Sequence, residues 1–142
     1  MRLALAFLAT TFLATAAALA AVSDAHAETP ADFLRNFEAA ARTSSPHFTG
    51  FSAQRGEAFF KTTHGREWSC ASCHTQNPTA GGRHAKTDKP ITPLAPAANA
   101  ERFTRPDKVE KWFRRNCNDV VGRECTPLEK GDVLTYLNSL RK

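Results

Sequence analysis

Cys70-Ala71-Ser72-Cys73-His74 is the stretch of this sequence that constrains the fold most strongly. Two thiols at this spacing can form thioether bonds to both vinyl groups of one porphyrin, and the adjacent imidazole then reaches the iron. A redox-active dithiol would need a βαβ context, and a zinc site would need a second ligand pair at suitable spacing. The sequence offers neither. The motif therefore predicts one covalent haem c, held by Cys70 and Cys73, with His74 as the proximal iron ligand.

The first 27 residues have the pattern of a secretory signal peptide. Met1 and Arg2 form a positive start, residues 3–22 are almost wholly Ala, Leu, Phe and Thr, and Ala25-His26-Ala27 is a small-x-small cleavage site. An uncleaved membrane anchor is the alternative, because the apolar run approaches the roughly 20 residues that span a bilayer. Its weak hydrophobicity and the cleavage site favour removal. We therefore expect a signal peptide over 1–27 and a single domain over 28–142, located in the periplasm without stable membrane insertion.

The net positive charge of the chain indicates which kinds of binding partner to expect. The chain carries a formal net charge of +5, which favours an acidic partner or an anionic membrane face. Nucleic acid is not expected, since the sequence lacks a basic run with interleaved aromatic residues. Four cations lie within residues 108–115, namely Lys108, Lys111, Arg114 and Arg115. They form either a basic patch that steers an acidic redox partner or an ordinary solvated helix face.

Hydrophobic periodicity predicts an all-α domain. Helical spacing of apolar residues indicates helices over 31–42, 52–61 and 107–116, and a last helix that begins at Pro127 with Thr126 as its cap. Glu129 completes a capping box with Thr126. Six proline and glycine residues within 75–100 rule out long regular structure there.

The other two cysteines, Cys117 and Cys125, do not belong to a second haem-binding motif. In an oxidising compartment, a pair at this separation with Gly122 between them is expected to form a disulfide. Two free thiols are the alternative.

The absence of methionine from the mature chain limits the sixth iron ligand. Met1 is the only methionine and leaves with the signal peptide, so the His/Met pair of many electron-carrying cytochromes c is excluded. The remaining candidates are His47, His64 and His84, an Asn or Lys side chain, water, or an open position. His64 lies so close before Cys70 that we expect it on the proximal side.

Four segments resemble a known family. They are 91–96 (ITPLAP), 102–104 (RFT), 109–118 (VEKWFRRNCN) and 122–127 (GRECTP), and together they resemble the sphaeroides haem protein (SHP) family of high-spin, oxygen-binding cytochromes c. The likeness runs from about residue 52 to residue 140. It implies a class I cytochrome c fold with an additional N-terminal helix.

The resemblance also implies a role for Asn116. In that family the Asn before the first disulfide cysteine ligates ferric haem iron and leaves on reduction; the related cytochrome c″ carries His there instead. A neutral amide oxygen is a hard, weak donor that suits Fe(III) better than Fe(II), so reduction would open the site to dioxygen, nitric oxide or carbon monoxide. Spacing alone favours a different role for Asn116, as a helix cap. His84, His47, water or an open position remain alternatives for the iron.

Around the haem, we expect Pro93, Leu94, Phe103 and Trp112 to pack against the porphyrin, although each could be ordinary core. The predicted function is a gas-binding redox haem protein, and the resemblance implies a dihaem cytochrome c, or another acidic redox protein, as electron donor. A plain electron carrier is the alternative, and so is a reductase of peroxide or nitrogen oxides, for which the sequence has no clear acid–base pair. Whether the protein is an enzyme stays open.

Overall fold

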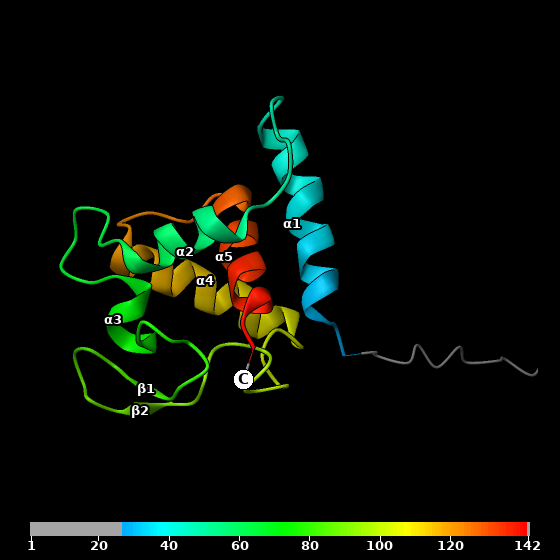
Figure 1. Ribbon diagram of the computed structural model, residues 1–142. Helices are drawn as coiled ribbons and strands as arrows, with labels where there is room; N and C mark the ends of the chain where they lie inside the picture. Colours follow the sequence, from blue (N-terminus) through cyan, green and yellow to red (C-terminus); the bar gives the residue numbers. More distant parts are fainter. Residues whose placement is uncertain (1–26, 142) are drawn as a thin grey trace, which may run out of the picture.

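The computed structural model describes residues 27–141 (Figure 1). The helices are α1 (Pro30–Ser44), α2 (Ala53–Lys61), α3 (Cys70–His74), α4 (Pro106–Val120) and α5 (Pro127–Ser139). Two short strands, β1 (Gly82–Arg83) and β2 (Pro90–Ile91), pair antiparallel. The all-α prediction is confirmed, and most of the predicted signal peptide lies outside the described residues. No helix within 27–141 is long and apolar enough to cross a membrane.

Helix α5 begins as the sequence predicts. The Thr126 hydroxyl accepts from the Glu129 amide at 3.2 Å, and the Glu129 carboxylate accepts from the Thr126 amide at 2.8 Å. Arg123 also pairs with this carboxylate at 2.7 Å. Burial by itself raises the pKa of Glu129, but the hydrogen bonds from Arg123 and Thr126 outweigh it and leave that pKa below its ordinary value.

Helix α4 is longer than predicted, and this matters for the site. It continues four residues beyond Asn116 to Val120, since Cys117 and Val120 are both buried and lie on its inner face. Gly122, with φ of +80°, lies in the turn that follows, where a left-handed backbone suits glycine. Asn116 is therefore inside the helix rather than at its end.

The crossing of α2 and α5 forms the centre of the core. A Cβ at Gly56 would lie only 1.9 Å from the Asp132 carbonyl oxygen, so only glycine permits this approach of the two helices. Beside it, the fully buried ring of Phe60 packs on Tyr136 with centroids 5.6 Å apart.

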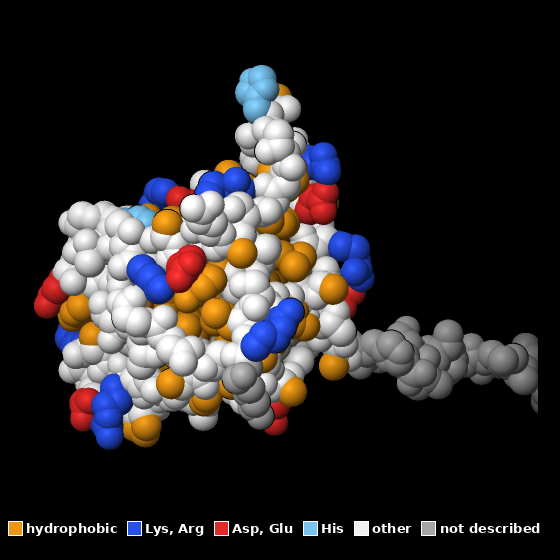
Figure 2. Space-filling model, viewed as in Figure 1, with side chains coloured by type: hydrophobic (Ala, Val, Ile, Leu, Met, Phe, Trp, Pro, Cys, Tyr) orange, Lys and Arg blue, Asp and Glu red, His pale blue; other side chains and the backbone are white. Residues whose placement is uncertain are grey.

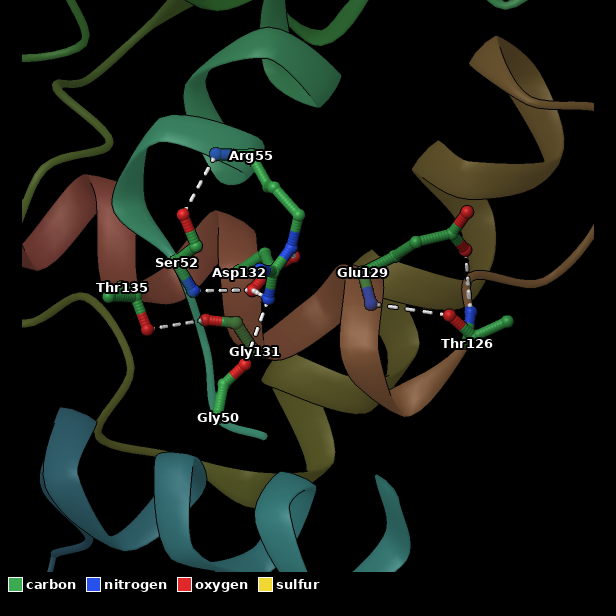
Figure 3. A network of polar contacts seen from close by, with 8 residues as sticks. All are labelled: Gly50, Ser52, Arg55, Thr126, Glu129, Gly131, Asp132 and Thr135. Carbon is green, nitrogen blue, oxygen red and sulfur yellow. Dashed lines mark hydrogen bonds and ion pairs between the residues drawn. The ribbon is translucent and has the colours of Figure 1, made fainter. Parts of the chain in front are cut away.

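A polar network holds the same crossing (Figure 3). The buried carboxylate of Asp132 accepts from the Ser52 amide at 2.6 Å and from Arg55 Nε at 2.7 Å. Arg55 also donates from Nη2 to the Gly50 carbonyl at 2.8 Å. Because a carboxylate with several donors tolerates burial, Asp132 can join the start of α2 to α5 inside the core.

Helix α1 is the predicted additional N-terminal helix. It stands at one end of the molecule against α5 (Figure 1). Phe33 and Phe37 are buried in one cluster with Val109 and Leu134, and Phe37 meets Phe113 edge-on at 5.7 Å. On the face shown in Figure 2, hydrophobic side chains reach the surface where α1 meets α5.

Candidate haem site

All the residues of the Cys70–His74 motif that were predicted to bind haem line one cavity. The cavity has a volume of about 380 Å³ and is bounded by α2, α3, α4 and α5 together with the 84–105 loop. Helix α3 carries the motif, and Ser69 and Ser72 cap its start with reciprocal hydrogen bonds. The motif is thus presented by a short, capped helix at the wall of the cavity.

The two motif cysteines are not bonded to each other. Burial raises the pKa of the Cys70 thiol to about 12, so this sulfur is protonated at neutral pH. The sulfur of Cys73 accepts a hydrogen bond from the Ala85 amide at 3.2 Å. A reactive dithiol would need a lowered thiol pKa, so this environment does not suit redox exchange and is consistent with thioether attachment.

His74 is held in its neutral form. Burial, and to a lesser degree the charge of Arg102, lowers the pKa of His74 to about 4. The neutral imidazole is the form that ligates iron. The residues present therefore fit a haem: two separate thiols and a neutral imidazole at the wall of one cavity.

Asn116 lines the same cavity from α4. It is half-buried, and among the residues that the structure describes its side-chain amide has no hydrogen-bonding partner. Its neighbour Asn118, in contrast, is exposed and donates to the Arg114 carbonyl at 2.8 Å. Because α4 continues to Val120, the interpretation of Asn116 as a helix cap is wrong.

The structure contains the disulfide that the sequence predicts. Cys117 and Cys125 are bonded, with Cα atoms 5.6 Å apart, and both are buried at the cavity wall. The alternative of two free thiols is therefore wrong. The disulfide joins the last turn of α4 to the residue before the N-cap of α5, and so holds the backbone next to Asn116.

Three of the four residues that were predicted to pack against the porphyrin line the cavity: Leu94, Phe103 and Trp112. Pro93 is not among the lining residues. Its carbonyl faces a neighbour instead and accepts from Arg102 Nε at 2.9 Å. The backbone of Pro93 is thus used to hold the loop, while the next residue presents its side chain to the cavity.

Of the alternative histidine ligands, only His84 lines the cavity. It lies in the β1–β2 hairpin, which packs beside Cys73 on α3, and its Nδ1 accepts from the Lys86 and Thr87 amides at 3.3 Å. His64 is engaged with the Phe59 carbonyl at 2.8 Å, and His47 is exposed. Asn116 thus faces the cavity from α4, whereas His84 is held on the side of the motif helix.

Sequence reasoning did not identify Arg102, which also lines the cavity. Arg102 belongs to the family-like segment 102–104, but nothing in that segment indicates that the arginine side chain lines a cavity rather than the surface. Its position became evident only from its half-burial and from its bonds to the 92–93 backbone.

Comparisons with known proteins agree with this geometry. A family model described as a domain of unknown function (DUF1924) matches residues 46–137. Cytochrome c″ of Methylophilus methylotrophus is 45% identical over 101 residues, which are 68% of this chain and 70% of that protein. Cytochrome c-type protein SHP of Cereibacter sphaeroides is 42% identical over 132 residues, which are 90% of this chain and 97% of that protein.

Two solved structures, of SHP and of cytochrome c″, are also similar to this chain. Oxidised SHP, described as an oxygen-binding cytochrome c, superposes with a TM-score of 0.71 at 42% identity and covers 80% of this chain and 99% of that one. Oxidised cytochrome c″ from Methylophilus methylotrophus also superposes with a TM-score of 0.71, at 39% identity, over 80% of this chain and 95% of that one. The predicted class I cytochrome c fold with an additional N-terminal helix is confirmed.

Proposed function

We propose that this chain, which belongs to the family of SHP and cytochrome c″, is a periplasmic monohaem cytochrome c that releases Asn116 from its iron on reduction and then binds a small diatomic gas. The observation that carries the proposal is the Asn116 amide, which faces the cavity of His74 without a hydrogen-bonding partner among the described residues. An amide that lines the cavity and is not engaged within the described part of the chain is free to ligate an iron, so a ligand role would account for its position.

Each residue of the site has a separate role in binding the haem or its iron. Cys70 and Cys73 would hold the haem through thioether bonds, and His74 would ligate the iron from α3. The bound haem supplies an iron that changes oxidation state and accepts a sixth ligand. Asn116 offers a weak amide oxygen, which favours Fe(III) and should leave Fe(II). The disulfide at Cys117 and the surrounding helix keep Asn116 close enough to rebind after reoxidation.

Dioxygen is the ligand best supported, since SHP is described as an oxygen-binding cytochrome c. Nitric oxide and carbon monoxide bind the same class of open ferrous site and are expected to bind here. The second candidate is a plain electron carrier, in which the sixth ligand stays in place on reduction. Reduction of peroxide or nitrogen oxides has no comparable observation in its favour.

Electron entry is proposed at the basic patch of α4, formed by Lys108, Lys111, Arg114 and Arg115. Trp112 lies within this patch, is 46% exposed, and also lines the cavity. Lys111 Nζ and the Arg115 guanidinium lie 5.8 and 5.6 Å from the centre of its ring. An exposed aromatic ring between cations suits contact with an acidic redox protein, for which a dihaem cytochrome c is our candidate.

The test is a set of absorption spectra of the purified holoprotein, ferric and dithionite-reduced, with and without carbon monoxide. We expect a high-spin ferrous spectrum that shifts promptly on addition of carbon monoxide. A low-spin ferrous spectrum indifferent to carbon monoxide would mean that a strong ligand stays bound, and would leave the electron carrier as the function.

Variants of α4 then identify the ligand. Asn116→Ala should change the ferric spectrum and leave the ferrous spectrum as it is. Asn116→His should give a low-spin ferric haem, because imidazole is a stronger donor than an amide. Asn118→Ala is the matched control, since it removes an exposed amide two residues further along the same helix. An Asn116→Ala ferric spectrum identical to that of the control would exclude Asn116 as ligand.

Export is tested separately by sequencing the N-terminus of the protein recovered from the periplasm. Glu28 as the first residue is the expected result, and a chain that still begins at Met1 in the membrane fraction would contradict it.

A further inference from the structure

Arg102 is a half-buried cation at the wall of the cavity. One edge of its guanidinium holds the preceding loop: Nε donates to the Pro93 carbonyl at 2.9 Å, and Nη2 donates to the Thr92 carbonyl at 2.8 Å and to the Thr92 hydroxyl at 3.0 Å. Within residues 27–141, Nη1 makes no hydrogen bond and no carboxylate pairs with this arginine. Two N–H donors of a fixed, planar group therefore remain available.

The other Lys and Arg residues at the cavity wall are all exposed, namely Lys89, Arg105, Lys108 and Arg115. Arg105 is exposed and paired with Asp107 at 3.0 Å, and Arg115 lies over the Trp112 ring. Both remain largely hydrated. Arg102 is the one whose pKa is lowered by loss of hydration, which means that its burial opposes its charge.

A partly buried charge normally has a counter-ion, because desolvation is costly without one. The anions that a haem brings into such a cavity are its two propionates. The free Nη1 group can donate a charge-assisted hydrogen bond to a carboxylate oxygen, and the loop already holds the Nε and Nη2 side of the guanidinium in place.

We propose that Arg102 binds a haem propionate and, by placing its charge beside the haem, raises the reduction potential of the iron. The proposal rests on the proposed haem function but not on the release of Asn116. The guanidinium is held by Thr92 and Pro93, so it also ties the propionate to the loop that presents Leu94 to the cavity. A fixed cation near the haem favours the ferrous state, because that state carries one positive charge fewer.

The test compares Arg102→Gln with Arg105→Gln in the holoprotein. The two variants remove the same charge from neighbouring positions, but only Arg102 lacks a carboxylate partner in the described part of the chain. The midpoint potential and the resonance Raman bending mode of the propionates are measured for each. We expect Arg102→Gln to lower the potential well below that of Arg105→Gln and to shift the propionate mode, which Arg105→Gln should leave unchanged.

Arg102→Lys separates charge from geometry and serves where Arg102→Gln does not mature. It should restore most of the potential while the propionate mode stays shifted, because the flexible lysine side chain cannot be held by the 92–93 backbone and donate from a fixed Nη1 at the same time. An unchanged propionate mode in the Arg102 variants, or equal falls in potential for Arg102→Gln and Arg105→Gln, would overturn the proposal. All these variants keep Asn116, so any contribution of its release to the potential is common to them and cancels in the comparison.

Discussion

Replacing Gly56 by Ala adds one methyl group where α2 and α5 approach most closely, and so tests whether that approach stabilises the fold. A Cβ there would lie 1.9 Å from the Asp132 carbonyl oxygen, whereas ordinary contacts begin at 3.4 Å. The difference, 3.4 − 1.9, means that α2 and α5 would have to separate by about 1.5 Å. Overpacking usually costs 1–3 kcal/mol, and since the clash is with backbone, we expect Gly56→Ala to lose about 3 kcal/mol of the free energy of unfolding.

Thermal unfolding of the holoprotein measures this loss. In a domain of this size, about 3 kcal/mol corresponds to a fall in Tm of roughly 10 °C. The haem site should respond as well, because Phe60 from α2 and Leu137 from α5 both line the cavity. We therefore also expect the ferric absorption spectrum of Gly56→Ala to differ from that of the unmodified protein.

Gly81→Ala is the matched control. The nearest heavy atom to a Cβ at that position is the Ile91 carbonyl oxygen at 3.4 Å, an ordinary contact, so its stability should change by less than about 0.5 kcal/mol. If Gly56→Ala melts at the same temperature as Gly81→Ala, then the close approach of α2 and α5 does not support the fold, and the reasoning from it is refuted.

Three further perturbations address the capping network, the disulfide and the basic patch. Glu129→Gln should cost about 1 kcal/mol at neutral pH. Because the pKa of Glu129 is lower in the folded state, this stabilisation is present above about pH 4.5 and is lost as the pH falls further. Replacing Cys117 and Cys125 by Ser should remove roughly 2.5 kcal/mol by loop-entropy arithmetic and weaken ferric ligation by Asn. Reversing Lys111 and Arg114 to Glu should slow electron transfer from an acidic donor and flatten its salt dependence.

Each of these predictions has its own contrary outcome. The free energy of unfolding is measured for Glu129→Gln and for the unmodified protein, at pH 7 and at acid pH. The difference between the two proteins should be larger at pH 7, and an equal difference at both pH values would contradict the lowered pKa of Glu129. An unaltered ferric spectrum in the variant with both Cys117 and Cys125 replaced by Ser would mean that the disulfide does not position Asn116. For the patch, the single reversal Lys111→Glu is compared with Lys86→Glu on the β1–β2 loop, and equal effects of these two single reversals would leave only net charge as the cause.

Local sequence determined the chemistry and several of the elements. The Cys70–His74 motif, the capping box at Thr126 and Glu129, and the disulfide partners each depend on residues close together in the chain. Such features are decided by short-range geometry, because spacing alone determines which groups can reach one another. Because Met1 is the only methionine and lies in the predicted signal peptide, the sequence also predicted without any structure that the iron has no methionine ligand.

The tertiary structure decided which side chains line the cavity. Residue spacing alone predicted that Asn116 caps a helix. The structure instead continues α4 to Val120, so that Asn116 lies inside the helix and lines the same cavity as His74. Pro93 was predicted to pack against the haem, but it is not among the residues that line the cavity, and its carbonyl accepts from Arg102. These assignments depend on what lies opposite a residue, and contacts between distant segments are set by packing rather than by local spacing.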